Sequence, residues 1–240
     1  MSVIGSCTRQ YSEYSLSSLI RHLSTIPIRV ELAKERTKPS IGFEQFCRRA
    51  SRSNHRTIFA LKLDIRKFFD SVDHEILCKL IERKISDSDT LWLIKLILDS
   101  FPQGLPLGNV TSQLFANIYL NELDRFVKHQ LKAKYYLRYC DDFILLNPDR
   151  PVQNEQLDKI CSFLTEHLKL DLHPNKIITR TYRQGIDFLG YVVRPCVRTL
   201  RTKTRQRILK NISEKNLSSY LGVLDHCDGY KIRQKLLSLL

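Results

Sequence analysis

Three aspartates have the residue type and setting of a cation site. Asp141 and Asp142 stand side by side between two apolar runs, and Asp64 ends another apolar run upstream. An apolar strand that enters a tight acidic turn and returns as an apolar strand places carboxylates at a hairpin tip. Burial and mutual repulsion are costly there unless a positive ion lies between the carboxylates. Because Mg²⁺ prefers carboxylate oxygens, the pattern predicts a magnesium site.

Such a site suits nucleotidyl transfer. Two cations roughly 3.5 to 4 Å apart can activate a 3′-hydroxyl and neutralise the charge of a leaving pyrophosphate. The reaction needs two or three aspartates brought together from separate strands. An acidic pair by itself is more often a surface turn, so the neighbouring residues must decide between the two interpretations.

The charge distribution favours a polyanionic partner. Of the 240 residues, the first 56 hold 10 Lys/Arg against 4 Asp/Glu, and residues 176–240 hold 14 against 4. The stretch between them has 15 basic and 17 acidic residues, so a slightly acidic centre lies between two basic arms. This arrangement is typical of a protein whose basic flanks bind a nucleic acid that runs across a central metal site. Scattered Lys and Arg can equally form a solvated surface.

The seven cysteines and the hydropathy indicate an intracellular protein. The cysteines form no C-x-x-C pair and no Cys/His cluster at zinc spacing, which is typical of reduced thiols. The sequence has no signal-peptide pattern and no apolar run near the ~18 residues of a membrane span. We therefore expect a soluble, cytoplasmic protein without a membrane partner.

The elements that must position the aspartates can be read from the apolar pattern. Residues 58–63 predict a buried strand that ends at Asp64, and Asp73 can cap the helix that follows. Residues 135–146 predict the acidic hairpin. A second hairpin is expected from Ile177 to Val193, with its turn near Gln184 and Gly185. Helical patterns over 215–224 and 230–240 end the chain.

Five sequence motifs lie on or beside these elements, and their order along the chain resembles that of a known family. They are LDIRKFFDSVDH from residue 63, QGLPLGNVTSQLFAN from residue 103, YCDD from residue 139, Lys176, and FLGY from residue 188. This series resembles motifs A to E of bacterial reverse transcriptases over roughly residues 42–240. The motif B wording and the tail around residues 219–222 and 230–233 are most similar to enzymes of diversity-generating retroelements. Group II intron and retron enzymes are more distant.

The resemblance implies roles for individual residues. Asp64 and Asp141 would ligate two Mg²⁺ ions, with Mn²⁺ as a substitute, and Asp142 and the carbonyl of Ile65 would contribute. Lys176 would protonate pyrophosphate, although it could simply end a strand in solvent. The residues implied to bind the nucleotide, besides Ile65, are Phe69, Gln103, Gly104 and Ser112. The bland alternatives are a core aromatic for Phe69 and a helix cap for Ser112.

The remaining implied roles concern nucleic acid. Phe188, Leu189 and Gly190 would grip the primer end, yet their apolar character would serve the core equally well. Six basic residues would lie along the backbone of an RNA–DNA duplex, or else form a solvated helix face: Arg198, Arg201, Lys203, Arg205, Arg207 and Lys210. The expected partners are an RNA template, a DNA or RNA primer and deoxynucleoside triphosphates; a diversity-generating retroelement enzyme would add a small basic accessory protein.

The sequence therefore predicts an α+β polymerase palm, built on a small antiparallel sheet with packed helices. The expected division is a reduced or truncated fingers region over 1–56, a palm over 57–193 and a short helical, basic thumb over 194–240. The resemblance predicts RNA-directed DNA polymerisation by two-metal nucleotidyl transfer, as part of a retroelement. Two rivals are a catalytically incomplete fragment that only binds nucleic acid and a phosphodiesterase that uses the same cations.

Overall fold

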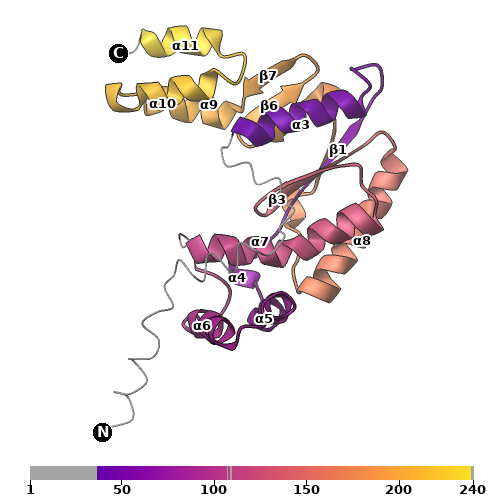
Figure 1. Ribbon diagram of the computed structural model, residues 1–240. Helices are drawn as coiled ribbons and strands as arrows, with labels where there is room; N and C mark the ends of the chain where they lie inside the picture. Colours follow the sequence, from indigo (N-terminus) through magenta and orange to yellow (C-terminus); the bar gives the residue numbers. More distant parts are fainter. Residues whose placement is uncertain (1–36, 107, 109, 239–240) are drawn as a thin grey trace. The chain divides into compact units, whose positions relative to one another are not determined.

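The computed structural model describes residues 37–106, 108 and 110–238 (Figure 1). These residues belong to two compact units. The helical unit comprises described residues within 65–132 and 158–173, and the sheet unit comprises 37–64, 133–157 and 174–238. Most of the region predicted as reduced fingers, residues 1–36, lies outside the described residues.

A four-stranded antiparallel sheet forms the centre of the sheet unit. Its strands are β1 (Phe59–Asp64), β2 (Tyr135–Tyr139), β3 (Asp142–Asn147) and β4 (Ile178–Thr181), in the order β2-β3-β1-β4. The central strands β1 and β3 are nearly continuous apolar runs, and Leu61, Leu63 and Phe143 are buried. The predicted strand ending at Asp64 and the predicted acidic hairpin are both confirmed.

Helix α3 (Thr37–Ala50) covers part of this sheet. Phe43, Cys47 and Ala50 are spaced by four and three residues, so they share one face, and all three are buried. The helix contacts β2 and β3, and the ring centroid of Phe43 lies 5.3 Å from that of Phe188. Burying an apolar side chain of this size stabilises the fold by roughly 1.5–3 kcal/mol, so this face anchors α3 to the core.

A smaller antiparallel sheet and three helices complete the sheet unit (Figure 1). The sheet contains β5 (Ile186–Phe188), β6 (Tyr191–Arg194) and β7 (Val197–Leu200) in sequence order. The helices are α9 (Thr202–Lys210), α10 (Glu214–Leu224) and α11 (Tyr230–Leu237). Together they enclose a buried cluster of their own, formed by Tyr191, Leu200, Ile208, Leu224 and Leu236.

The hairpin predicted from Ile177 to Val193 is wrong. β4 pairs with β1, whereas β5 pairs with β6 in the other sheet. Between them, the 3-10 turn η3 (Tyr182–Gln184) redirects the chain. The backbone N–H of Tyr182 donates to the carbonyl oxygen of Ile58 at 3.0 Å, and its side chain is buried in the core beneath α3. Because Tyr182 is held in this way, β4 and β5 lie in different sheets, although the sequence pattern predicted that they pair with each other.

The helical unit is built around α7. Its elements are α4 (Phe68–Ser71), α5 (His74–Glu82), α6 (Ser88–Asp99), α7 (Val110–Arg125), the π-helical turn η1 (Phe126–Gln130) and the second half of α8 (Arg150–Leu168). Asp73 caps α5 as predicted, accepting from the N–H of Ile76 at 3.0 Å. The buried Tyr119 of α7 donates its hydroxyl to the carbonyl oxygen of Leu168 at 2.7 Å. This bond ties α7 to the end of α8.

Helices combined with two small antiparallel sheets confirm the predicted α+β class. In the described part of the chain, no helix combines the length and apolar composition that a membrane crossing requires.

Candidate active site

The acidic turn connects β2 to β3 through a two-residue loop. Tyr139 pairs with Asp142, so Cys140 and Asp141 form the loop. Cys140 has a φ of 54°, a left-handed conformation found in tight hairpin loops. The buried Arg138 donates from Nη1 to the carbonyl oxygen of Cys140 at 3.0 Å. Arg138, which sequence reasoning missed, thus supports the loop that presents Asp141.

Asp64 lies beside this turn because β1 and β3 are neighbours. Antiparallel pairing makes Asp64 and Asp142 Cα partners at the ends of their strands. Directly opposite residues in such a pair have Cα atoms about 4.5–5.5 Å apart. The fold therefore brings the aspartate that ends the first apolar run to the pair predicted from the acidic hairpin.

Lys176 reaches the same place from another direction. It ends the 3-10 turn η2 (Pro174–Lys176), which precedes β4. Its Nζ lies 2.8 Å from Oδ1 and 2.9 Å from Oδ2 of Asp64. An ammonium between both oxygens is a strong, charge-assisted contact. The structure thus places Lys176 beside the aspartates with which it was predicted to act.

A second lysine, Lys62, holds Asp142. Its Nζ lies 2.9 Å from Oδ2 of Asp142, whereas Oδ1 of Asp142 is buried without a hydrogen-bond partner among the described residues. Sequence reasoning missed this contact. The available signal was the single charge within the apolar run 58–63, two residues before Asp64, because alternate residues of a strand face the same side.

The electrostatics are those of carboxylates held close together. Burial raises the pKa of Asp141, and the negative charge of Asp64 raises it further, although Lys176 and Arg138 oppose this. Burial also raises the pKa of Asp142 despite the opposing charge and hydrogen bond of Lys62. The hydrogen bond to Asp64 raises the pKa of Lys176. The site therefore attracts positive charge.

The motif B loop meets motif A within the helical unit. Gly104 has a φ of +69°, and a Cβ there would lie 2.3 Å from the carbonyl oxygen of Phe69. That oxygen accepts from the N–H of Leu105 at 2.7 Å. Nε2 of His74, which the sequence motifs did not single out, lies 2.6 Å from the carbonyl oxygen of Gly104. Only glycine allows this close approach of two backbones.

Four other predicted nucleotide-binding positions lie in the helical unit with Gly104. Gln103 is exposed and, with Gly104, lines a polar cavity of about 470 Å³. The Phe69 side chain is partly buried, with its ring centroid 5.3 Å from that of Phe68. Ile65 is buried and forms an isolated β-bridge with Leu172. Ser112 is buried inside the first turn of α7 rather than at its cap.

The predicted primer grip divides between core and turn. Phe188 is fully buried and packs against α3, as in the core alternative. Leu189 and Gly190 form the loop between β5 and β6, both with positive φ, of 51° and 87°. The carbonyl oxygen of Gly190 accepts from the N–H of Arg201 at 2.9 Å. The backbone of this loop is therefore fixed to the segment that enters α9.

The six predicted backbone-binding residues also divide into two groups. Arg198 pairs with Glu44, with 3.5 Å between Nη1 and Oε2, and Arg201 pairs with Asp187. These two guanidinium groups therefore have structural partners. The other four are exposed on α9, and no ion pair engages them among the described residues: Lys203, Arg205, Arg207 and Lys210.

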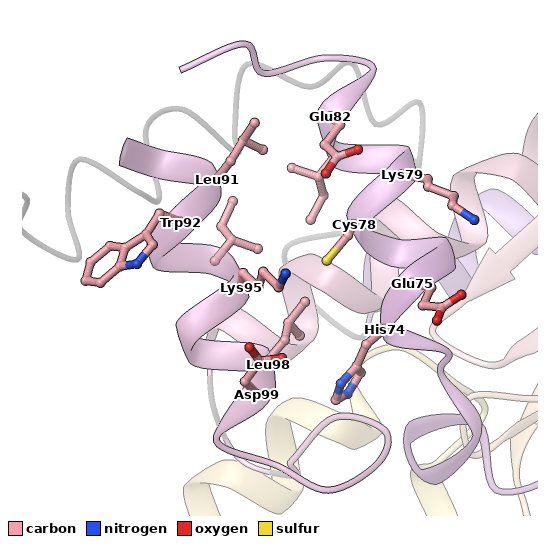
Figure 2. Close-up of a pocket in the computed structure, with 12 residues that line it drawn as sticks. His74, Glu75, Cys78, Lys79, Glu82, Leu91, Trp92, Lys95, Leu98 and Asp99 are labelled. Atoms are coloured by element: carbon pink, nitrogen blue, oxygen red, sulfur yellow. The ribbon is translucent and has the colours of Figure 1, made fainter. Parts of the chain in front are cut away.

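A separate groove of about 400 Å³ lies between α5 and α6 of the helical unit (Figure 2). His74 and Cys78 line it from α5, and Leu91, Trp92 and Leu98 line it from α6. None of the residues predicted as site residues lines this groove. It is thus distinct from the carboxylate cluster, which belongs to the sheet unit.

The family can now be stated. The family described as reverse transcriptase (RNA-dependent DNA polymerase) matches residues 15–193. This match covers most of the chain, so the chain belongs to the reverse transcriptase family. The activity of that family is RNA-directed DNA polymerisation, a nucleotidyl transfer. The predicted family is confirmed at this level.

The chain is also similar to individual proteins of other organisms. Protein YkfC of Escherichia coli K12 is 26% identical over 206 residues, which cover 67% of this chain and 52% of YkfC. The group II intron-encoded protein LtrA of Lactococcus lactis is 42% identical over 82 residues, or 30% of this chain and 14% of LtrA. The chain therefore spans about half the length of YkfC.

The fold is similar to that of telomerase. Apo telomerase from Candida tropicalis matches with a TM-score of 0.64 and 14% identity, over 88% of this chain and 44% of that one. Telomerase from Candida albicans, in complex with a fragment of telomeric RNA, matches with a TM-score of 0.60 and 15% identity over 92% of this chain and 45% of that one. At this identity the likeness shows the shared fold.

Reverse transcriptases typically use divalent metal ions, and the carboxylate cluster fits such ions in its chemistry. All three side chains offer oxygen ligands, and the buried Oδ1 of Asp142 lacks a hydrogen-bond partner among the described residues. No group of three His, Cys, Asp or Glu in the described ranges is already arranged as metal ligands. Lysines hold two of the carboxylates: Lys176 contacts both oxygens of Asp64, so an ion at Asp64 competes with it, whereas Lys62 contacts only Oδ2 of Asp142 and leaves Oδ1 open to an ion.

Proposed function

We propose that this chain is an RNA-directed DNA polymerase that extends a primer 3′-end on an RNA template by two-metal nucleotidyl transfer. One observation carries the proposal: β1 and the β2–β3 hairpin bring Asp64, Asp141 and Asp142 together at one end of a sheet, in a chain of the reverse transcriptase family. When bound, two Mg²⁺ ions would activate the primer hydroxyl and neutralise the triphosphate. Mn²⁺ would substitute for them.

The protein groups have separate tasks in this proposal. Asp64 and Asp141 are the principal ligands, and Asp142 and the carbonyl of Ile65 contribute. Lys176 neutralises Asp64 before the ions bind and then donates a proton to pyrophosphate. Its side chain is half-exposed and flexible, so it can leave Asp64 for the leaving group without disturbing the sheet.

Substrate selection belongs to the helical unit in this proposal. The ring of Phe69 would pack under the sugar and collide with a 2′-hydroxyl, so that deoxynucleotides are selected. Gln103 and Gly104 would contact the incoming nucleotide and the template base, and Ser112 would support their loop from α7. The cavity beside Gln103 and the close contact between Gly104 and Phe69 support this grouping.

Nucleic acid would bind the sheet unit. The loop formed by Leu189 and Gly190, backed by Phe188, would hold the primer end. The four exposed basic residues of α9 would contact the duplex backbone, and Arg198 and Arg201 would support them through their own ion pairs. RNA template, DNA or RNA primer and deoxynucleoside triphosphates are the partners that this function requires.

The retroelement type is a narrower part of the proposal. The motif B wording and the C-terminal residues 219–222 and 230–233 favour a diversity-generating retroelement, which would add a small basic accessory protein. The relatives named above include a group II intron protein. Testing the purified chain with templates from both kinds of element would separate these two origins.

Primer extension tests the central proposal. The full 240-residue chain is given a primed RNA template, deoxynucleoside triphosphates and Mg²⁺, and the Asp141→Asn variant is compared with it. Asp149→Asn is the matched control, because Asp149 is an exposed turn carboxylate whose Oδ1 accepts from the N–H of Val152, a bond that Asn can keep. We expect Asp141→Asn to abolish extension and Asp149→Asn to preserve it.

The rival functions predict other outcomes of the same experiment. Binding of the RNA–DNA duplex without extension by the unmodified chain would support a nucleic-acid-binding protein that has lost catalysis. Release of nucleotides from the 3′-end without incorporation would support a phosphodiesterase. Either result would overturn the proposed function.

A further inference from the structure

Lys62 joins the acidic turn to the smaller sheet. It lies on β1 two residues before Asp64, and its side chain is only 15% exposed. Its Nζ lies 2.9 Å from Oδ2 of Asp142 and donates to the carbonyl oxygen of Asp187 on β5 at 3.2 Å. One ammonium therefore contacts both the second aspartate of the turn and the strand that leads to Leu189.

The connection continues beyond β5. The carboxylate of Asp187 pairs with the guanidinium of Arg201 through both of its oxygens. The backbone N–H of Arg201 donates to the carbonyl oxygen of Gly190 at 2.9 Å. A continuous polar path thus runs from Asp142 through Lys62 and β5 to the β5–β6 loop and the start of α9. All of its members belong to the sheet unit.

We propose that Lys62 is a positioning residue for nucleotidyl transfer, which fixes Asp142 relative to the β5–β6 loop and limits the affinity of the carboxylate site for cations. The inference rests on the proposed function. The positive charge of Lys62 is the counter-ion of the buried Asp142 carboxylate. The hydrogen bond from Lys62 to β5 fixes the position of the β5–β6 loop. Neither task requires contact with substrate.

The two tasks predict opposite effects when the charge is removed. Without Lys62, the site has one positive charge fewer within a few ångströms of its carboxylates, so a divalent cation binds more tightly. At the same time, Asp142 loses the partner that holds it, and the loop loses its link to the turn. Cation binding therefore improves while extension falls. A lysine that only stabilised the fold would weaken both.

The test measures Mn²⁺ binding and primer extension on the same full-length proteins. Lys62→Met removes the charge, Lys62→Gln removes it but keeps a hydrogen-bond donor, and Lys62→Arg keeps the charge. Lys159→Met is the matched control, because Lys159 is exposed on α8 and has no ion pair among the described residues. Free Mn²⁺ is followed by electron paramagnetic resonance, and circular dichroism shows that each variant is folded.

We expect Lys62→Met and Lys62→Gln to bind Mn²⁺ about threefold or more tightly than the unmodified chain. We expect kcat for extension to fall about tenfold or more with Lys62→Met, the KM for nucleotide to stay within about twofold, and Lys62→Arg to recover most of the loss. Unchanged or weaker Mn²⁺ binding by Lys62→Gln would overturn the inference. If Lys62→Met does not fold, the glutamine variant decides alone.

The failure of this inference can be distinguished from that of the proposed function. Absence of extension by the unmodified chain would refute the proposed function, whereas the Mn²⁺ measurement would still test the electrostatic task of Lys62. Normal extension by Lys62→Met would refute the positioning task and leave the proposed function intact.

Discussion

The ammonium of Lys176 lies between the two carboxylate oxygens of Asp64, 2.8 Å from Oδ1 and 2.9 Å from Oδ2. The two residues are 112 positions apart in the sequence, and they meet because β1 and η2 lie together in the sheet unit. A lysine thus supplies the positive charge that Asp64 needs beside two other aspartates. In the proposed reaction, the ammonium of Lys176 must leave the carboxylate of Asp64 and contact the pyrophosphate leaving group.

Replacing Lys176 by Met tests this exchange. We expect primer extension to fall about tenfold or more, because general-acid catalysis typically contributes 10²–10⁴-fold and water can replace part of it. Lys176→Arg should recover less than full activity, since the guanidinium group stays protonated and is a poor proton donor near neutral pH. Extension rates with saturating nucleotide provide the measurement. Full activity of Lys176→Met would contradict the proposed role in proton transfer.

The Lys176–Asp64 ion pair also predicts a pH dependence of stability. The hydrogen bond to Asp64 raises the pKa of Lys176 above its ordinary 10.5. The stabilising contribution is therefore fully present below pH 10.5 and is lost as pH rises through the raised pKa. The Tm difference between the unmodified chain and Lys176→Met should stay constant from pH 7 to about 10 and then decrease as pH rises through the raised pKa of Lys176. A difference that disappears near neutral pH would contradict this.

Asp141 is expected to cost stability. Its pKa is raised, first by burial and then by the charge of Asp64, so the folded state holds the proton more tightly than the unfolded state does. The charged carboxylate therefore destabilises the fold above the raised pKa, and this effect fades as pH falls towards the ordinary 3.8. Asp141→Asn should raise Tm at pH 7 by at most about 2–4 °C, the scale of about 1 kcal/mol in a domain of this size, because the side chain is only partly buried and solvent screens part of the repulsion.

Two controls accompany the Asp141 measurement. The Tm advantage of Asp141→Asn should shrink when both proteins are heated near pH 4. It should also shrink in saturating Mg²⁺, because a bound cation stabilises the unmodified chain more than the variant. An Asp141→Asn variant that is less stable than the unmodified chain at neutral pH would show that this carboxylate has a structural partner instead.

Local sequence patterns predicted those features of the fold that depend on residues close together in the sequence. The apolar runs on either side of Asp141 and Asp142 specified the hairpin, and Asp73 marked the start of α5. The contacts of Lys62 and Arg138 could not be predicted, because they depend on which strands become neighbours. The wrong hairpin over 177–193 has the same cause: a four-residue strand such as β4 carries too little pattern to specify whether β1 or the following strand is its partner.

Gly104→Ala should damage the motif B loop. The added Cβ would lie 2.3 Å from the carbonyl oxygen of Phe69, and the φ of +69° already disfavours alanine. We expect a loss of about 2 kcal/mol or more in the free energy of unfolding, measured in urea, together with a raised KM for nucleotide. The control is Gly222→Ala, where nothing lies within 4 Å of the new Cβ in the exposed part of α10. That variant should gain about 0.5–1 kcal/mol.

The exposed basic side of α9 should determine duplex affinity through charge. Changing all four of its exposed residues to glutamine removes up to four phosphate contacts: Lys203, Arg205, Arg207 and Lys210. Each phosphate contact contributes about 0.7–0.9 to the slope of log affinity against log salt concentration. We expect the slope for an RNA–DNA hybrid to fall by up to about 3.6, measured by fluorescence anisotropy between low and moderate salt.

The matched control for the α9 variant changes four exposed lysines of the helical unit to glutamine: Lys79, Lys84, Lys95 and Lys159. It removes the same net charge, so a general electrostatic effect would lower the salt slope equally in both variants. We expect the control to keep most of the slope. Arg201→Gln should instead lower Tm with little change of slope, because its guanidinium pairs with Asp187 and its removal leaves that half-buried carboxylate without this partner. Equal salt slopes for the α9 variant and the lysine control would show that α9 is not the surface along which the duplex lies.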